Sequence, residues 1–118
     1  MDMTTSYRIQ SADRDPNLLL DPAEQISVAW WTESVRRGVS VCRSREDLAT
    51  YIAQSGIPWD ATWVLVELEG YASDDQDEDA QCPGRPELTH PTRIVSVTPI
   101  ADDFEDEIFA AYDAQYAA

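Results

Sequence analysis

Four short segments of the chain carry the hydrophobic pattern of β-strands. They are rich in Val, Ile, Thr and aromatic residues, and turn-forming residues separate them. The segments are residues 5–10, 39–42, 62–69 and 92–98. The last two follow each other in the chain with only a polar stretch between them, so we expect them to pair antiparallel.

The segment 62–69 is the strongest of these strands. Successive side chains of a strand point to opposite faces. One face is wholly apolar and consists of Val64, Val66 and Leu68. The other face changes from apolar at Trp63 and Leu65 to acidic at Glu67 and Glu69. The strand is therefore expected to present two carboxylates on one face near its end.

A first helix is predicted over residues 21–37. Asp21 suits the N-cap, Pro22 suits the first helical position, and Gly38 follows as a stop signal. The apolar stripe of this segment is broad, however, and Ser27 to Trp31 also fits a strand. Both interpretations stay open at this point.

Two further helices have clearer signals. Ser44 suits the N-cap of a helix that ends at Gly56. The last helix begins at Asp102 or Asp103, and acidic residues in its first turn suit the positive end of the helix dipole. Its apolar face is predicted to contain Phe104, Ile108, Tyr112, Gln115 or Tyr116, and also Phe109.

These elements predict the fold class α+β, with the order β-α-β-α-β-β-α. We expect one small domain over residues 1–118, with an antiparallel or mixed sheet of about four strands and about three helices. A long polar loop is expected at 71–91. Loops of this length are uncommon in compact domains and are usually functional or mobile.

The charge of the chain is strongly negative and unevenly placed. The 118 residues include 23 acidic residues and eight basic ones, and all eight bases are arginine. Residues 1–59 hold eight acids and six arginines, a net charge of −2, whereas residues 60–118 hold 15 acids and two arginines, a net charge of −13. Such a field repels nucleic acid and anionic lipid and attracts basic surfaces. Direct nucleic-acid binding is therefore excluded most firmly. Strong acidity without lysine also resembles proteins from salt-adapted or high-GC genomes. Salt adaptation should spread acids over the whole surface, however, and so explains the skew less well.

The sequence has no legible catalytic, metal or cofactor site. Cys42 and Cys82 form no C-x-x-C pair, and His90 is the single histidine and precedes Pro91, so we expect it in a turn. Four glycines give little material for a nucleotide-binding loop. The N-terminus has no signal-peptide pattern and the apolar runs are too short to span a membrane, so a cytoplasmic protein without cofactor or metal is expected.

The long loop contains a run of alternating carboxylates at Asp75, Asp77 and Asp79. An EF-hand needs a glycine directly after the third aspartate and a glutamate at loop position 12. Ala80 and Pro86 stand at those positions. The mismatch leaves three interpretations of the loop: a flexible, solvated acidic segment, a segment that docks on a basic partner, or a weak, nonspecific site for a divalent cation.

The start of the last helix carries more acid than capping needs. Five acids occupy six positions: Asp102, Asp103, Glu105, Asp106 and Glu107. Like charges four residues apart on a helix repel. The excess indicates either a solvent-exposed face or a contact surface.

The short motif Glu67-Leu68-Glu69 resembles the E-x-E motif of ADP-ribosyltransferases, and Tyr7-Arg8 also fits that comparison. The resemblance implies a small enzyme that uses Glu67 and Glu69. A strongly negative domain is a poor host for an anionic dinucleotide, so this interpretation is the alternative and not the main one.

In size, net charge and clustering of acids, the chain resembles the small acidic inhibitors of phages and mobile elements that mimic DNA, including anti-restriction and anti-CRISPR proteins. That resemblance implies a non-enzymatic inhibitor that blocks the basic groove of a nucleic-acid-binding partner protein. An acidic immunity protein that neutralises a basic toxin is a further alternative. The expected partner-binding residues are Asp74, Asp75, Asp77, Glu78, Asp79, Asp102, Asp103, Glu105, Asp106 and Glu107, with Glu67 and Glu69 linking the two groups.

Overall fold

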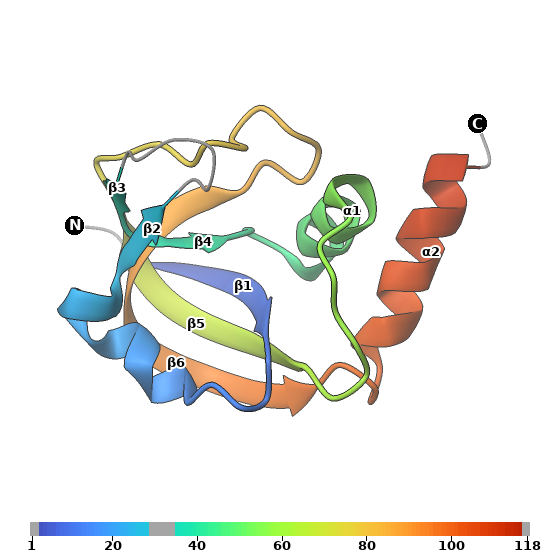
Figure 1. Cartoon of the computed structure of the whole chain (residues 1–118), viewed down its shortest axis with the longest axis horizontal. Coiled ribbons are helices and arrows are strands. Elements are labelled where there is room, and N and C mark those ends of the chain that lie inside the picture. The colour runs from blue at the N-terminus through green and yellow to red at the C-terminus, as the bar shows by residue number, and fades with distance from the viewer. Residues whose placement is uncertain (1–2, 29–34, 117–118) are drawn as a thin grey trace.

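A four-stranded antiparallel sheet forms the centre of the computed structural model, which describes residues 3–28 and 35–116. Its strands are β1 (Thr4–Gln10), β5 (Val64–Ala72), β6 (Glu87–Pro99) and β4 (Val39–Val41), and they lie in that order across the sheet (Figure 1). Neighbouring strands pair antiparallel, including β5 with β6. The α+β class and this pairing are therefore confirmed.

The sheet curls until its two outer strands meet. Cys42, directly after β4, bridges Tyr7 of β1 through two backbone hydrogen bonds of 2.8 and 2.9 Å. β4 therefore pairs with β6 on one side and touches β1 on the other. Strand twist drives this curling, and closure protects the outer strands from pairing with other chains.

The two faces of β5 are covered by different parts of the chain. On one face, Val66 and Leu68 pack with Leu19 and with residues of β4. On the other face, Leu65 packs against residues of both helices. The alternation predicted for this strand is confirmed, and apolar cover on both faces explains its nearly continuous hydrophobic run.

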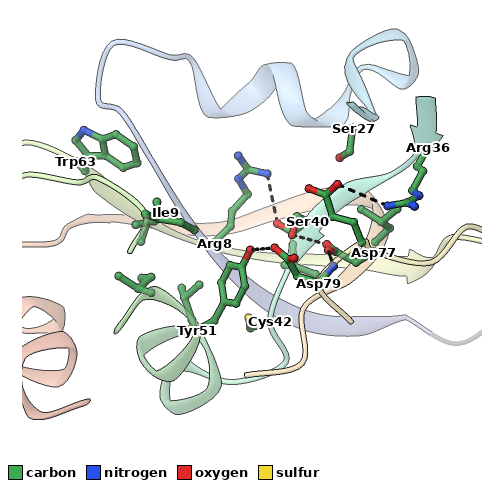
Figure 2. Close-up of a pocket in the computed structure, with 16 residues that line it drawn as sticks. Arg8, Ile9, Ser27, Arg36, Ser40, Cys42, Tyr51, Trp63, Asp77 and Asp79 are labelled. Atoms are coloured by element: carbon green, nitrogen blue, oxygen red, sulfur yellow. Dashed lines mark hydrogen bonds and ion pairs between the residues drawn. The ribbon is translucent and has the colours of Figure 1, made fainter. Parts of the chain in front are cut away.

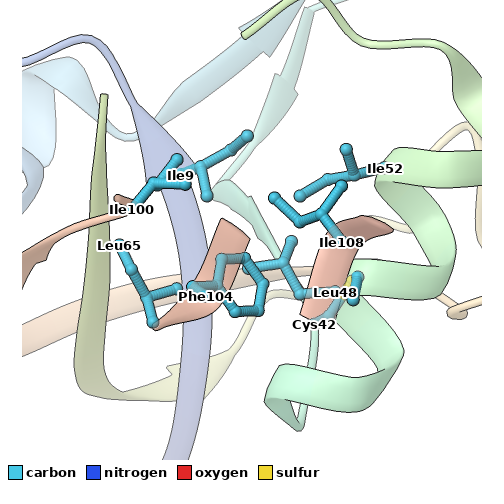
Figure 3. Close-up of a cluster of buried hydrophobic side chains, with 9 residues drawn as sticks. Ile9, Cys42, Leu48, Ile52, Leu65, Ile100, Phe104 and Ile108 are labelled. Carbon is cyan, nitrogen blue, oxygen red and sulfur yellow. The ribbon is translucent and has the colours of Figure 1, made fainter. Parts of the chain in front are cut away.

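Two α-helices pack against one side of the sheet and against each other. In α1 (Arg45–Ser55), the Ser44 hydroxyl accepts a hydrogen bond from the Asp47 amide at 3.0 Å, and Gly56 ends the helix with φ +70°. In α2 (Phe104–Tyr116), Phe104 and Ile108 are fully buried among residues of α1 and the sheet (Figure 3). Neither helix is long and apolar enough to cross a membrane, within the part of the chain that the structure describes.

The prediction of a helix over residues 21–37 is wrong. The chain instead forms two short 3-10 turns, η1 (Pro16–Leu20) and η2 (Pro22–Glu24), and then the hairpin strands β2 (Ile26–Val28) and β3 (Val35–Arg37). The described residues therefore contain two α-helices where about three were expected, and the order of elements differs.

The capping interactions predicted at residues 21–24 do form, but they cap a single 3-10 turn and not a long helix. The Asp21 carboxylate accepts a hydrogen bond from the Ala23 amide at 3.0 Å, which a 3-10 turn satisfies as well as a helix does. The β-forming residues that follow then favour the strand alternative. The stretch from Ser27 to Trp31, which also fits a strand, is described only as far as Val28, and Trp30 and Trp31 lie outside the described residues.

The acidic loop is shorter than the predicted range 71–91. It covers residues 73–86, because β5 continues to Ala72 and β6 already begins at Glu87. His90 is consequently a strand residue and not a turn residue, and its ring lies 5.2 Å from that of Tyr71. Pro91 is tolerated in β6 where the pairing register with β5 shifts.

The outer face of α2 corrects the expectation for two aromatic residues. Phe109 and Tyr116 were assigned to the apolar face of this helix, yet their exposed fractions are 50% and 78%. Only Phe104 and Ile108 are fully buried, because one helix that packs on one side of a sheet has room for a narrow buried stripe. The two exposed aromatic rings therefore need another explanation.

Candidate functional site

A pocket of about 350 Å³ lies between β1, β4, α1 and the acidic loop (Figure 2). Its apolar wall includes Ile9 of β1, Leu48 and Ile52 of α1, and Trp63. Polar groups line the rest, and they come from segments far apart in the sequence. The polar lining residues are Arg8, Ser27, Arg36, Ser40, Tyr51, Asp77, Glu78 and Asp79.

Arg8 is the unusual residue of this pocket. Its side chain extends from β1 toward β4, and one terminal nitrogen donates a long hydrogen bond of 3.4 Å to the Ser40 carbonyl oxygen (Figure 2). The Arg8 Nε is buried and has no acceptor among the described residues. Burial, together with repulsion by Arg14, lowers the pKa of Arg8 to about 10, so the guanidinium still carries its charge at neutral pH.

The acidic loop is fixed to the pocket rim by its own carboxylates. Asp77 is buried and accepts hydrogen bonds from the Ser40 hydroxyl at 2.6 Å and from the Asp79 amide at 2.8 Å. Asp79 accepts from the Tyr51 hydroxyl of α1 at 2.5 Å. Burial first, and then the hydrogen bond to Asp79, raise the pKa of the Tyr51 phenol. These bonds hold the loop in place, so the flexible, solvated interpretation does not describe it.

The rest of the loop is attached to β3. The Asp75 carboxylate accepts a hydrogen bond from the Arg37 amide at 2.6 Å, and Glu78 lies 3.8 Å from the Arg36 guanidinium. Burial first, and then the neighbouring aspartates, raise the pKa of Glu78. Asp74 is exposed, and no hydrogen bond or ion pair is found for it within the described ranges. Four of the five loop acids expected to bind a partner are thus used inside the molecule.

The acids at the start of α2 divide into two sets. Asp103 and Glu107 both pair with Arg45 of α1, whose guanidinium also lies 5.5 Å from the centre of the Phe104 ring. Three acids make no ion pair with any residue in the described ranges: Asp102, Glu105 and Asp106. Arg45 therefore fastens α2 to α1 and leaves the outer carboxylates free.

Glu67 and Glu69, which were expected to link the two acidic groups, both lie in the middle of β5. Glu69 pairs with Arg93 of β6 at 2.6 Å, and Glu67 stands directly opposite Tyr7 in the sheet. In Figure 1 the loop runs along the top of the molecule, whereas α2 begins at the lower right. The acidic loop and the start of α2 therefore lie in different parts of the fold.

The outer face of α2 combines acidic and aromatic side chains in one stripe. Asp106, Phe109, Asp113 and Tyr116 follow each other at spacings of three, four and three residues, which places them on one side of a helix. All four are exposed, and Phe109 also lies 5.9 Å from the ring of Trp59. We call these four residues the α2 stripe. Asp113 was not among the expected partner-binding residues, and Phe109 and Tyr116 were expected on the apolar face of the helix.

Removing the hydroxyl group of Tyr51 should loosen the acidic loop. We expect Tyr51→Phe to lower the free energy of unfolding by about 1–3 kcal/mol, because the Asp79 carboxylate loses a partly buried donor. The fold raises the pKa of the Tyr51 phenol, so it contributes stability below pH 10 that is lost as pH rises further. Urea unfolding between pH 7 and 11 should show a shallower alkaline loss for the variant, and hydrogen exchange should quicken at residues 77–82. Equal rates of amide hydrogen exchange in the wild type and the variant would show that the Tyr51 hydroxyl does not hold the loop.

No cluster of three or more His, Cys, Asp or Glu side chains is placed to hold a metal ion within residues 3–28 and 35–116. Comparison with family models, curated proteins and solved structures finds no match for the chain. Its function must therefore be argued from the geometry of the pocket and of the α2 stripe.

Proposed function

We propose that this protein is a non-enzymatic inhibitor that binds a basic, nucleic-acid-binding partner protein and blocks the site for DNA or RNA. The observation that carries the proposal is the α2 stripe, in which exposed carboxylates alternate with exposed aromatic rings. The unpaired acids before and beside it, Asp102 and Glu105, extend the same negative surface.

The chemistry of the stripe fits a basic groove. α2 has four acidic residues and no basic one, so a positive surface is attracted and an anionic one is repelled. Aromatic side chains contribute strongly to protein interfaces when they fill pockets on the partner. If the only role of this surface were to keep the protein in solution, acidic side chains would be enough. The two exposed aromatic rings among them therefore favour a surface that contacts another protein.

The α2 stripe is presented on a fixed support. Phe104 and Ile108 anchor the helix in the core, and Arg45 ties its first turn to α1 through Asp103 and Glu107. A rigid row of carboxylates loses little conformational entropy on binding. This rigidity supports mimicry of a phosphate row by α2, whereas most of the loop acids are already occupied by internal contacts.

A competition experiment tests the proposal. The protein, immobilised on a support, is exposed to a lysate of its source cells, and bound proteins are eluted with duplex DNA or with salt. We expect a basic nucleic-acid-binding protein to be retained, to be released by the duplex, and to bind more weakly as salt rises. A purified partner that holds DNA and this protein together, or a retained protein without a basic surface, would refute the inhibitor proposal.

A further inference from the structure

The pocket beside the acidic loop holds a positive charge that no carboxylate neutralises in the described part of the chain. Arg8 takes part in none of the five ion pairs found there. Its Nε is buried without an acceptor, and among residues 3–28 and 35–116 the side chain makes one hydrogen bond, the long one to Ser40. Arg8 as a whole is half-buried, and its Nε is fully removed from water. Taking part of a charged group out of water without a partner is costly, even in a protein with a large excess of acid.

The carboxylates of the same pocket are not free to receive a cation. Asp77 and Asp79 accept hydrogen bonds from Ser40 and Tyr51, and Glu78 lies beside Arg36. Among the charged groups that line this pocket in the described part of the chain, Arg8 is the cation without an ion-pair partner, whereas Arg36 lies beside Glu78. The three carboxylates still lower the electrostatic potential, which disfavours a ligand with two negative charges.

We propose that this pocket binds a small organic molecule with one carboxylate head and an apolar body, and that the head pairs with the Arg8 guanidinium. A carboxylate offers two oxygens that match the donor fork of arginine. The body would lie along Ile9, Leu48, Ile52 and Trp63. A volume of about 350 Å³ is at the lower end of the range for ligand pockets, so the ligand is small.

Octanoate is a suitable probe for the full-length protein. We expect saturable binding with a dissociation constant on the order of 0.1–1 mM, within the usual affinity per atom for a ligand of this size. In NMR titrations, signals of Ile9, Ile52 and the Trp63 indole should shift most. The absence of saturation at 10 mM, or shifts confined to other surfaces, would overturn the proposal. That result would favour an ordered water between Arg8 Nε and Gln10 Oε1, the other buried polar atom without a partner.

Three ligands with the same chain separate the charge requirement from simple apolar burial. Octanol should bind at least about tenfold more weakly than octanoate because it lacks the charged head. Octyl phosphate should also bind more weakly because its second charge meets the acidic wall, and octylammonium should not compete. Equal binding of octanol and octanoate would show a nonspecific apolar site and would refute the role of Arg8.

Arg8→Met keeps an apolar stem and removes the charge. We expect at least a tenfold loss of octanoate affinity, with a melting temperature that stays equal or rises because the desolvated charge is gone. Arg93→Gln is the matched control, since it removes an exposed arginine outside the pocket and should leave octanoate binding unchanged. If Arg8→Met binds octanoate like the wild type, or only lowers the melting temperature, Arg8 is a structural residue. Should the variant fail to fold, the ligand series on the wild-type protein decides the matter.

Discussion

Replacing Phe104 by alanine is expected to lower the free energy of unfolding by about 3–5 kcal/mol. The ring is fully buried in the cluster that also contains Leu48, Ile52 and Ile108, so its removal leaves a cavity in the core (Figure 3). It also removes the aromatic face beneath the Arg45 guanidinium. For a protein of this size the melting temperature should fall by on the order of 10–20 °C.

Phe109→Ala provides the control on the same helix. Its ring is half exposed, so the loss of stability should stay below about 1 kcal/mol, although partner binding should weaken. Thermal unfolding followed by circular dichroism measures both variants. Similar losses of stability for Phe104→Ala and Phe109→Ala would mean that α2 does not pack as described.

Reversing the two acids of the α2 stripe should remove most of the affinity for a basic partner. We expect Asp106→Arg combined with Asp113→Arg to weaken binding at least about 100-fold, because two attractive contacts become repulsive at the centre of the proposed interface. The fold should tolerate the change. Arginine at 106 loses a favourable interaction with the start of the helix dipole, but arginine at 113 gains one near its end.

The double change Asp13→Arg and Glu24→Arg is the matched control. Both residues are exposed in the nearly neutral first half, and the net charge changes by the same amount. Titration calorimetry with the captured partner should give affinity close to that of the wild type, apart from a modest general electrostatic effect. If the two double variants lose affinity equally, binding depends on overall acidity and the α2 stripe is not the contact surface.

Elements with complete local signals could be predicted from the sequence. α1 has a hydroxyl cap at Ser44 and a glycine stop at Gly56, and both interactions lie within the helix itself. The two faces of β5 follow from a period of two residues, which holds whatever covers them. The excess of acid is likewise a property of composition alone, and so is its concentration in the second half.

Where local signals for helix and strand compete, tertiary contacts determine the secondary structure. Residues 21–37 contain a good helix start and good β-forming residues, and the strand outcome leaves Ser27 donating to the Gly38 carbonyl and Gln25 donating to the carbonyls of Leu19 and Pro91. No spacing in the sequence shows these partners, because Pro91 is distant in the chain. The helix prediction therefore failed where long-range hydrogen bonds outweighed capping.

The roles of the charged residues also depend on the tertiary structure. Sequence alone determined that the loop and the start of α2 are acidic, but only folding showed that Ser40, Tyr51 and Arg36 take up the loop acids. Folding also placed Arg8 in a pocket where no carboxylate of the described residues pairs with it. A charge pattern gives the sum of the charges, whereas pairing depends on distances of a few ångströms between segments that the chain brings together only when it folds.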